Sequence, residues 1–430
     1  MRPTPPATGV SALARTAEAA EAAGTVGLAG MAGLVNLAGS LRVVPGARPP
    51  LALQSSRRDW AARLAVGQTA AALPGLLASV FNLCSHAHRL CAQLALNAAV
   101  PGVQATLPPS HVAQRLRIET AQEHIRRMGL DWPRLLATGA TPAGATRAAQ
   151  AQPAHPTDLA AQAHAALPRC PLLHPAGQTD HWPATLAWLE HELLHMPATT
   201  WAHQWQAGGA GWLADWASRH TGWLAALLHA ARTADDPVPL NPAEALHAHA
   251  DGSNLQALAH ALRTQPGFSL APQWQGTCAH TGSWTRLNHP LPQLHPQPLT
   301  AWGLLGSRLA ELVHLCLHTP DQPEPLLHGA VQTGTHQGLA WVEMARGLLI
   351  HRVELNLGTG QPTVRACNVL APTEWNFHPH GAVAQAIARL DANQPAAEAE
   401  RRVRLLMAAF DPCVPFEMAA APTPTETPHA

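Results

Sequence analysis

Two alternating segments near the C-terminal end of the chain set its fold class. Residues 349–356 (LIHRVELN) and 363–370 (TVRACNVL) alternate apolar and polar side chains, and Gly358-Thr359-Gly360 lies between them. Alternation on both sides of a glycine-containing turn is typical of a β-hairpin. Most of the remaining chain has the three- and four-residue periodicity of helices. We therefore predict an α+β protein that is predominantly helical, with a small hairpin at 349–370.

Helical periodicity is clearest between residues 59 and 99. Cys84, Ala87 and Cys91 recur there at three- and four-residue intervals, which predicts that both thiols lie on one helix face. We expect an interruption of this helix at Pro74-Gly75. A short strand is predicted over 34–43, and further helices over 182–231, over 299–318, from 382 onward and over 396–409.

The charge balance excludes two classes of partner. The chain has 27 basic and 27 acidic residues and a formal net charge of zero, so it lacks the positive field that attracts nucleic acid or an anionic membrane surface. Residues 22–41 are long enough to span a bilayer, but their glycines and polar residues make them poorly apolar, and we expect no membrane insertion.

Seven cysteines without a CxxC spacing favour a reducing compartment. No targeting segment is evident, and we predict a cytoplasmic protein.

The segment His191-Glu192-Leu193-Leu194-His195 matches the HExxH motif of zinc peptidases. On a helix, the two imidazoles would face one way and bind Zn²⁺, with the glutamate as general base. However, the chain contains 27 histidines, which raises the rate of chance matches. No glutamate between Glu192 and Glu244 is available as a third ligand. A zinc peptidase is therefore a remote alternative to a plain surface helix.

A second pattern is spread over both ends of the chain. Its last segment is FDPC at 410–413, which alone would indicate only a helix that stops at a proline. The segments before it, in order, are NLAGSLRV at 36–43, Cys84 to Cys91, TGSWTR at 281–286, EMARG at 343–347, the hairpin, and PTEWN at 372–376. Together they resemble the RxEGHLRI, RICGxCxxxH, ETGPLAR, E-x-PRG, PTTWN and DPCxxCxxH motifs of the [NiFe]-hydrogenase large-subunit family. The resemblance covers residues 34–100 and 276–419.

The resemblance also implies how the chain is divided. Residues 138–180 are rich in Ala, Pro and Gly and lack periodicity, which predicts a linker or surface excursion. The predicted parts are a flexible arm (1–33), the N-terminal half of a large-subunit-like domain (34–137), a linker with a Trp- and His-rich helical insert (138–275), the C-terminal half of that domain (276–419) and a disordered tail (420–430).

The departures from the family motifs imply a protein that does not turn over hydrogen. In the family, four thiolates bind nickel and iron. Cys84 and Cys413 match two terminal nickel ligands, whereas Ala87 and Phe416 stand where the two bridging thiolates belong. Two sulfurs cannot form a thiolate site for two metals, so nickel is not expected. The position of the proton-relay glutamate is Ala38, which cannot accept a proton, and the final histidine position is Ala419. We therefore expect that this chain is not an enzyme.

The resemblance implies a site for a smaller metal unit. Arg346 and Thr373, with the adjoining Pro372, match residues beside the two cyanides on iron, and both side chains are donors for anionic ligands. Cys91 stands at the histidine position of the N-terminal motif and could replace a bridging thiolate, or be a buried core residue. The predicted metal ligands are Cys84, Cys413 and Cys91, and the predicted cofactor-binding residues are Arg346, Thr373 and Pro372. His86 and His88 flank this site; an imidazole there could bind iron but more often only packs.

A large-subunit relative without catalytic ligands resembles the HupK/HoxV-type hydrogenase expression/formation proteins. That resemblance implies a scaffold that holds or transfers the Fe(CN)2(CO) unit during assembly of the active site. It also implies two partners, a small HypC-like maturation chaperone and the hydrogenase large-subunit precursor. The main alternative is a metal-free chaperone or interaction protein for hydrogenase subunits.

Overall fold

The computed structural model describes residues 39–104, 108–137, 156–174, 181–234, 240, 244–287, 300–358 and 360–419. The arm predicted at 1–33, the relay position Ala38 and the tail predicted at 420–430 lie outside these residues.

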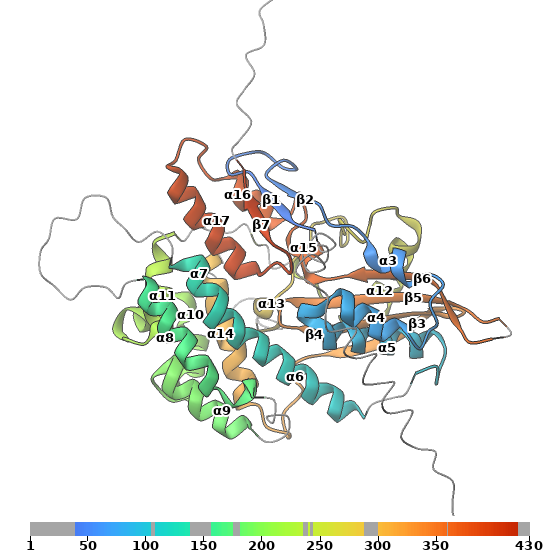
Figure 1. Ribbon diagram of the computed structural model, residues 1–430, viewed down its shortest axis with the longest axis horizontal. Helices are drawn as coiled ribbons and strands as arrows, with labels where there is room; N and C mark the ends of the chain where they lie inside the picture. Colours follow the sequence, from blue (N-terminus) through green and yellow to red (C-terminus); the bar gives the residue numbers. More distant parts are fainter. Residues whose placement is uncertain are drawn as a thin grey trace, which may run out of the picture.

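The central element is a four-stranded antiparallel sheet in the order β3-β4-β5-β6. The predicted hairpin is confirmed as β5 and β6, and two further strands extend it. Helices outnumber strands in the described residues, so the α+β class is confirmed. Figure 1 shows the sheet beside a separate group of helices. The strands are β3 (His328–Gly334), β4 (Gln337–Met344), β5 (Gly347–Asn356) and β6 (Thr363–Leu370).

The sheet is buried on both faces, because helices cover each of them. On β5, Leu349 belongs to the core that contains α5 (Ser85–Ala99), whereas Leu348 and Ile350 belong to a second core with α12 (Gly252–Thr264). This alternation follows the two-residue period of a strand. At Gly338 on β4, a Cβ atom would collide with a backbone carbonyl of α5. The glycine therefore allows α5 to lie directly on the sheet.

A group of helices forms the other side of the molecule (Figure 1). The helices predicted over 182–231, 299–318 and 396–409 are confirmed. Residues 156–166, predicted as linker, instead form α8, whose Leu159, Ala163 and Ala166 are buried. An alanine-rich helix face looks aperiodic in sequence, which explains the error. The helices are α6 (Pro109–Arg126), α7 (Trp132–Leu136), α8 (Pro156–Ala166), α9 (Trp182–Leu189), α10 (Ala198–Arg219), α11 (Trp223–Ala231), α14 (Ala301–Leu317) and α17 (Ala396–Phe410).

A small sheet joins the two ends of the described chain. Strand β1 (Leu41–Val43) pairs antiparallel with β2 (Leu53–Ser55) and parallel with β7 (Phe416–Met418). Of the strand predicted at 34–43, residues 41–43 are confirmed, residues 39 and 40 are not strand, and residues 34–38 lie outside the described residues. Figure 1 shows this sheet next to α16 (Ala382–Ala388) and α17.

The helical segment predicted at 59–99 is broken at different places than expected. It comprises α3 (Trp60–Ala65), α4 (Leu73–Val80) and α5. Pro74 lies in the first turn of α4, where its missing N–H removes no helical hydrogen bond. The interruption predicted at Pro74-Gly75 is therefore wrong, and the breaks lie at 66–72 and 81–84.

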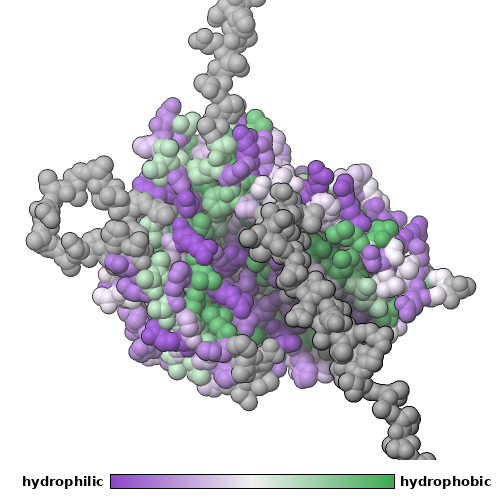
Figure 2. Space-filling model, in the orientation of Figure 1, coloured by the Kyte–Doolittle hydropathy of each residue, from purple (hydrophilic) through white to green (hydrophobic). Residues whose placement is uncertain are grey.

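The surface is mixed in polarity. Figure 2 shows polar side chains over most of the helical side and apolar side chains gathered near the region of α3 and α4, where Leu64 and Val66 are exposed. Among the residues that the structure describes, no helix combines the length and the apolar character needed to cross a bilayer.

Candidate functional site

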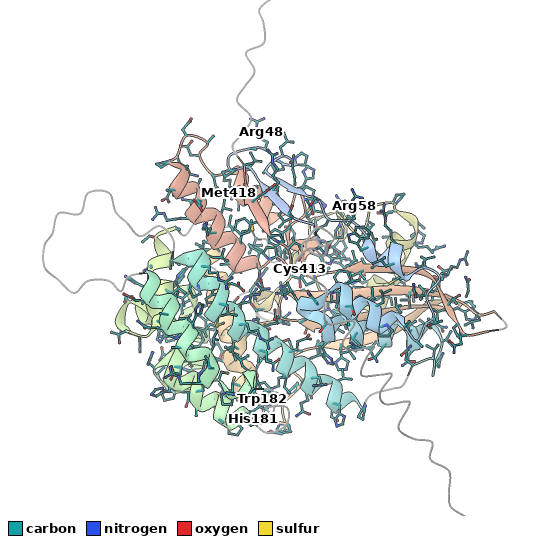
Figure 3. All side chains as sticks on the ribbon, viewed as in Figure 1. Arg48, Arg58, His181, Trp182, Cys413 and Met418 are labelled. Carbon is teal, nitrogen blue, oxygen red and sulfur yellow. The ribbon has the colours of Figure 1, made fainter. Side chains whose placement is uncertain are left out.

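Cys413 lies in the turn that connects α17 to β7, near the centre of the molecule (Figure 3). The helix ends at Phe410, and Asp411 adopts a left-handed conformation with φ of 51°. The Asp411 carboxylate accepts a hydrogen bond from Arg308 at 3.0 Å and forms ion pairs of 3.2 Å with both Arg127 and Arg346. Burial alone would raise the pKa of Asp411, but these guanidinium groups hold it below its ordinary value. The cysteine turn is thus anchored to the rest of the molecule.

Two donors point at the Cys413 sulfur. The Thr373 hydroxyl and the Arg57 Nη1 each donate to Sγ at 3.1 Å. Arg57 is held in place by an ion pair of 2.6 Å with Glu374. Thr373 belongs to α15 (Pro372–Asn376), which begins at the predicted residue Pro372. Charged and hydroxyl donors of this kind stabilise a thiolate.

Cys84 lies at the N-cap of α5 and is buried. Glu119 of α6 accepts hydrogen bonds from the backbone N–H groups of His86 and Ala87, at 3.1 and 3.0 Å. Burial raises the pKa of the Cys84 thiol well above its ordinary value; Arg346 opposes this and the charge of Cys413 adds to it. The structure therefore brings Cys84 into the electrostatic range of Cys413, and the thiol of Cys84 is neutral.

Arg346 is buried and pairs with two acidic residues, Glu123 and Asp411. Its Nη2 donates to Glu123 at 2.9 Å, whereas its Nη1 has no hydrogen-bond partner among the described residues. Burial opposes its charge, yet Asp411, Glu123, Cys84 and Cys413 together hold the pKa of Arg346 above its ordinary value. One buried N–H group of this guanidinium is thus available to a ligand.

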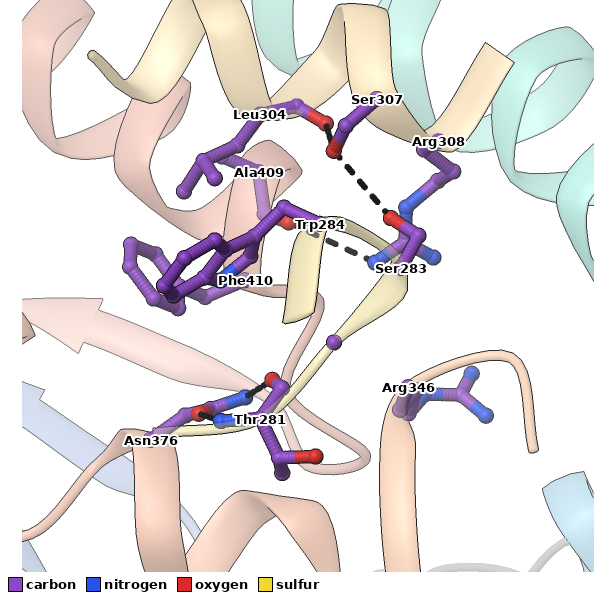
Figure 4. A pocket seen from close by; sticks show the side chains of 11 residues that line it. Thr281, Ser283, Trp284, Leu304, Ser307, Arg308, Arg346, Asn376, Ala409 and Phe410 are labelled. Atoms are coloured by element: carbon purple, nitrogen blue, oxygen red, sulfur yellow. Dashed lines mark hydrogen bonds between the residues drawn. The ribbon is translucent and has the colours of Figure 1, made fainter. Parts of the chain in front are cut away.

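The motifs TGSWTR and PTEWN meet beside Arg346. The side-chain amide of Asn376 accepts from the Thr281 N–H at 2.9 Å and donates to the Thr281 carbonyl at 2.8 Å. The Thr281 hydroxyl accepts from the Leu348 N–H at 2.9 Å, at the start of β5. Figure 4 shows the two bonds between Thr281 and Asn376, with the Arg346 guanidinium extending away from them. The small pocket in this view has a volume of about 10 Å³, so these motifs pack together and leave no ligand cavity.

Cys91 does not join this group. Its Sγ donates to the carbonyls of Ala340 at 3.4 Å and Leu349 at 3.9 Å, on the sheet that underlies α5. It also lies seven residues from Cys84, a rise of about 10 Å along a helix. The expectation that Cys91 points into the same cavity is therefore wrong, because two helical turns separate the two thiols. Cys91 is a buried part of the core.

Sequence reasoning missed Arg57 and His351 near the site, and it named His88 only as a residue that flanks it. Arg57 contacts Cys413, and no sequence pattern distinguishes it from its neighbour Arg58. His88 and His351 form a buried hydrogen bond, Nδ1 to Nε2, of 3.0 Å. The pKa of each imidazole is lowered by burial, and that of His88 also by His351, Arg57 and Arg346, so the pair is neutral. For the His88–His351 pair, the only signal in the sequence is the four-residue spacing that places His88 and Cys84 on one helix face.

A cavity of about 350 Å³ opens beside Cys413. Arg57, Thr373 and Glu374 line it; Arg57 and Thr373 also donate hydrogen bonds to the Cys413 sulfur, and Glu374 pairs with Arg57. Its other walls are largely apolar and include Leu51, Leu53, Leu270 and Phe377. Cys413 itself does not line this cavity; Arg57 and Thr373 connect the two.

The HExxH segment does not form the predicted helix face. Residues Glu190–Leu194 form a π-helical turn, and His195 ends it in a left-handed conformation. The His191 side chain is 85% exposed, and Glu192 pairs with Arg169 at 2.8 Å. The two imidazoles therefore lack the α-helical i,i+4 relation that a zinc site of this type requires.

No group of three or more His, Cys, Asp or Glu side chains is arranged to hold a metal ion in the described part of the chain. The site around Cys84 and Cys413 offers two sulfurs, with donors around them. This arrangement fits a metal unit that brings ligands of its own better than a bare ion.

Comparison with known proteins gives the family. No family model matches the chain. It is 38% identical over 409 residues to the hydrogenase expression/formation protein HoxV of Cupriavidus necator, covering 92% of this chain and 99% of that protein. It is 29% identical to HupK of Bradyrhizobium diazoefficiens, also named a hydrogenase expression/formation protein, covering 87% and 91%.

Solved structures similar to this chain include the Ni-Fe-Se hydrogenase from Desulfomicrobium baculatum, with 12% identity, a TM-score of 0.48 and coverage of 86% of this chain and 94% of that one. An NAD+-reducing [NiFe]-hydrogenase matches with 18% identity, a TM-score of 0.42 and coverage of 84% and 91%. The identity to HoxV, maintained over nearly the full length of both chains, decides the assignment: this chain belongs to the family of hydrogenase expression/formation proteins.

Proposed function

We propose that this chain, an accessory factor rather than a hydrogenase subunit, holds an Fe(CN)2(CO) unit between Cys84 and Cys413 during hydrogenase maturation. The observation that carries the proposal is the pairing of Arg346 with Asp411, two residues before Cys413, and with Glu123 of α6, the helix whose Glu119 caps α5 directly after Cys84. Iron that arrives with three diatomic ligands needs few protein ligands, and thiolates are suitable ones.

The same geometry favours release of the unit. The bridging positions are Ala87 and Phe416, so no closed four-thiolate site can form and nickel is not expected. Because the pKa of Cys84 is raised, binding of iron must displace a proton from that thiol. A site with only two sulfur ligands, at which a proton competes with the metal, can release the iron unit.

The cyanides would be bound by donors that already surround the sulfurs. The unpartnered Nη1 of Arg346 is suited to one cyanide nitrogen, and the Thr373 hydroxyl, which now donates to Cys413, can rotate towards the other. Pro372 begins the short helix that positions Thr373. The cavity beside Cys413 offers a path for transfer from a small HypC-like chaperone and to the large-subunit precursor. We place this exchange in the cytoplasm.

Infrared spectroscopy tests the proposal. The full chain, purified anaerobically from cells that make the iron unit, should show the stretching bands of CO and cyanide. Cys84→Ala and Cys413→Ala should each abolish these bands. Cys91→Ala, whose sulfur faces the sheet, and Cys316→Ala, a buried core residue of α14, should retain them. Bands that survive both of the first two substitutions would refute the ligand assignment.

A metal-free chaperone is the second candidate, and one observation favours it. Without any metal, the Cys413 sulfur already receives two hydrogen bonds, and Arg346 is already paired with Glu123 and Asp411. On this account the cysteines are structural. The Cys84→Ala/Cys413→Ala double variant would then support full hydrogenase maturation in cells, whereas the scaffold account predicts its loss.

A further inference from the structure

One buried imidazole beside the two cysteines has a nitrogen with no hydrogen-bond partner. His88 is 1% exposed, and its Nδ1 is paired with His351 Nε2 on β5 at 3.0 Å. Its Nε2 has no partner in the part of the chain that the structure describes. A buried polar atom is normally paired, so this nitrogen is free to make a hydrogen bond to a ligand.

The position of His88 on α5 directs its ring towards Cys84. His88 follows Cys84 by four residues, and helical side chains at this spacing lie one above the other on the same face. Side chains of a helix also lean towards its N-terminus. The His88 ring stacks on Phe81, three residues before Cys84, with 4.1 Å between ring centroids and an interplanar angle of 12°. The imidazole therefore lies over the turn that carries the thiol.

The charged groups of the site lie within electrostatic range of the His88 ring. Both Arg57, which donates to Cys413, and Arg346, which interacts electrostatically with both thiols, act on the His88 ring. His88 with Cys84 and Cys413 does not form a metal-binding group of three in the described residues. The ring is thus near the site but too far away to be a ligand, as expected for a group that contacts the ligands of the metal.

We propose that His88 is a positioning residue that donates a hydrogen bond from Nε2–H to a cyanide nitrogen of the bound iron unit, and that His351 fixes the tautomer which makes this possible. This inference rests on the proposed function. The two neutral imidazoles carry one proton each. In the bound state His351 Nε2–H donates to His88 Nδ1, and the proton of His88 is on Nε2, facing the cyanide. His88 then distinguishes a cyanide nitrogen, which accepts hydrogen bonds strongly, from the weakly accepting end of CO.

A matched pair of substitutions tests the proposal. In His88→Gln the side-chain amide reaches the place of Nε2, whereas in His88→Asn it reaches only the place of Nδ1. The control is His86→Gln, because His86 also has a buried unpartnered Nε2 but interacts with Arg115 and Arg89 instead of the cysteine site. Infrared spectra of each full-length protein, prepared anaerobically with the iron unit, are compared.

We expect His88→Asn to shift one cyanide band and to leave the CO band and the second cyanide band nearly in place. His88→Gln and His86→Gln should give the wild-type spectrum. His351→Phe should broaden or shift the same band as His88→Asn, because the imidazole of His88 is no longer held. Equal spectra for His88→Asn and His88→Gln, shifted or not, would overturn the proposal.

The outcomes separate this inference from the proposed function. Wild-type protein without CO and cyanide bands would contradict the scaffold itself, and the role of His88 with it. Wild-type bands that are abolished by Cys413→Ala but are the same in both His88 variants would contradict the role of His88 alone. Circular dichroism of each variant shows whether the fold is retained, and the wild-type comparison is made only with folded protein.

Discussion

Of the residues around Cys413, some could be predicted from the sequence as part of the site and others could not. Cys413, Thr373 and Arg346 lie in local motifs, so their positions could be predicted. Arg57 could not, because its contacts with Glu374 and Cys413 join segments that are 317 and 356 residues apart. Only the fold brings these residues together, and no local pattern marks Arg57 as part of the site.

Removal of Arg57 should destabilise the protein. Arg57→Met leaves the Glu374 carboxylate buried without its cation, and breaking a buried pair in this way costs about 3 kcal/mol or more. Urea unfolding measures the change, with Arg58→Met, an exposed neighbour, as the control. The Arg57→Met/Glu374→Gln double variant should recover part of the loss, because no charge is then left unpaired. A double variant as unstable as the sum of the single variants would show that the pair contributes nothing.

At the scale of elements, α5 is the helix on which the site depends. The sheet beneath it fixes its position, and Glu119 of α6 caps its N-terminus directly after Cys84. Burial raises the pKa of Glu119 to about 7, hydrogen bonds from the His86 and Ala87 N–H groups oppose this, and the charge of Glu123 adds to it. The cap therefore titrates near neutral pH.

This titration predicts a pH dependence of stability. The pKa of Glu119 is higher in the folded protein than the ordinary value of 4.5. The contribution of Glu119 to the free energy of unfolding is therefore fully present below pH 4.5 and is lost as the pH rises to about 7. Glu119→Gln should flatten the dependence of the free energy of unfolding on pH in this range. The effect is at most about 3 kcal/mol, reduced by solvent screening. Glu417→Gln, at an exposed position, should leave the wild-type curve unchanged.

The elements that sequence analysis misjudged have physical explanations. Pro74 begins a helix instead of breaking one, because the first turn tolerates its missing N–H. The HExxH segment matches the zinc-peptidase motif in sequence. However, a π-helical turn and the left-handed conformation of His195 end the helix within the motif. Long periodic helices and the β5–β6 hairpin were predictable because their signals are local. The three-residue strand β7 was not, because it is defined by its pairing with β1 at the other end of the chain.

At the scale of the whole molecule, the site exists only where the two halves of the chain meet. The parallel pairing of β1 with β7 and the ion pair of Asp411 with Arg127 join these halves. Residues 41–418 contribute to one continuous core that includes helices of the middle segment. Two cysteines from distant parts of the sequence can therefore share one environment without a disulfide.

The coordination of iron in the wild-type protein tests the central claim most directly. X-ray absorption at the iron edge, on anaerobically loaded full-length chain, counts the sulfur atoms bound to the metal. The account predicts two sulfurs per iron together with diatomic carbon ligands, and one sulfur in residual iron bound by either Cys84→Ser or Cys413→Ser. Wild-type iron bound by no sulfur, or an unchanged sulfur count in both variants, would contradict it.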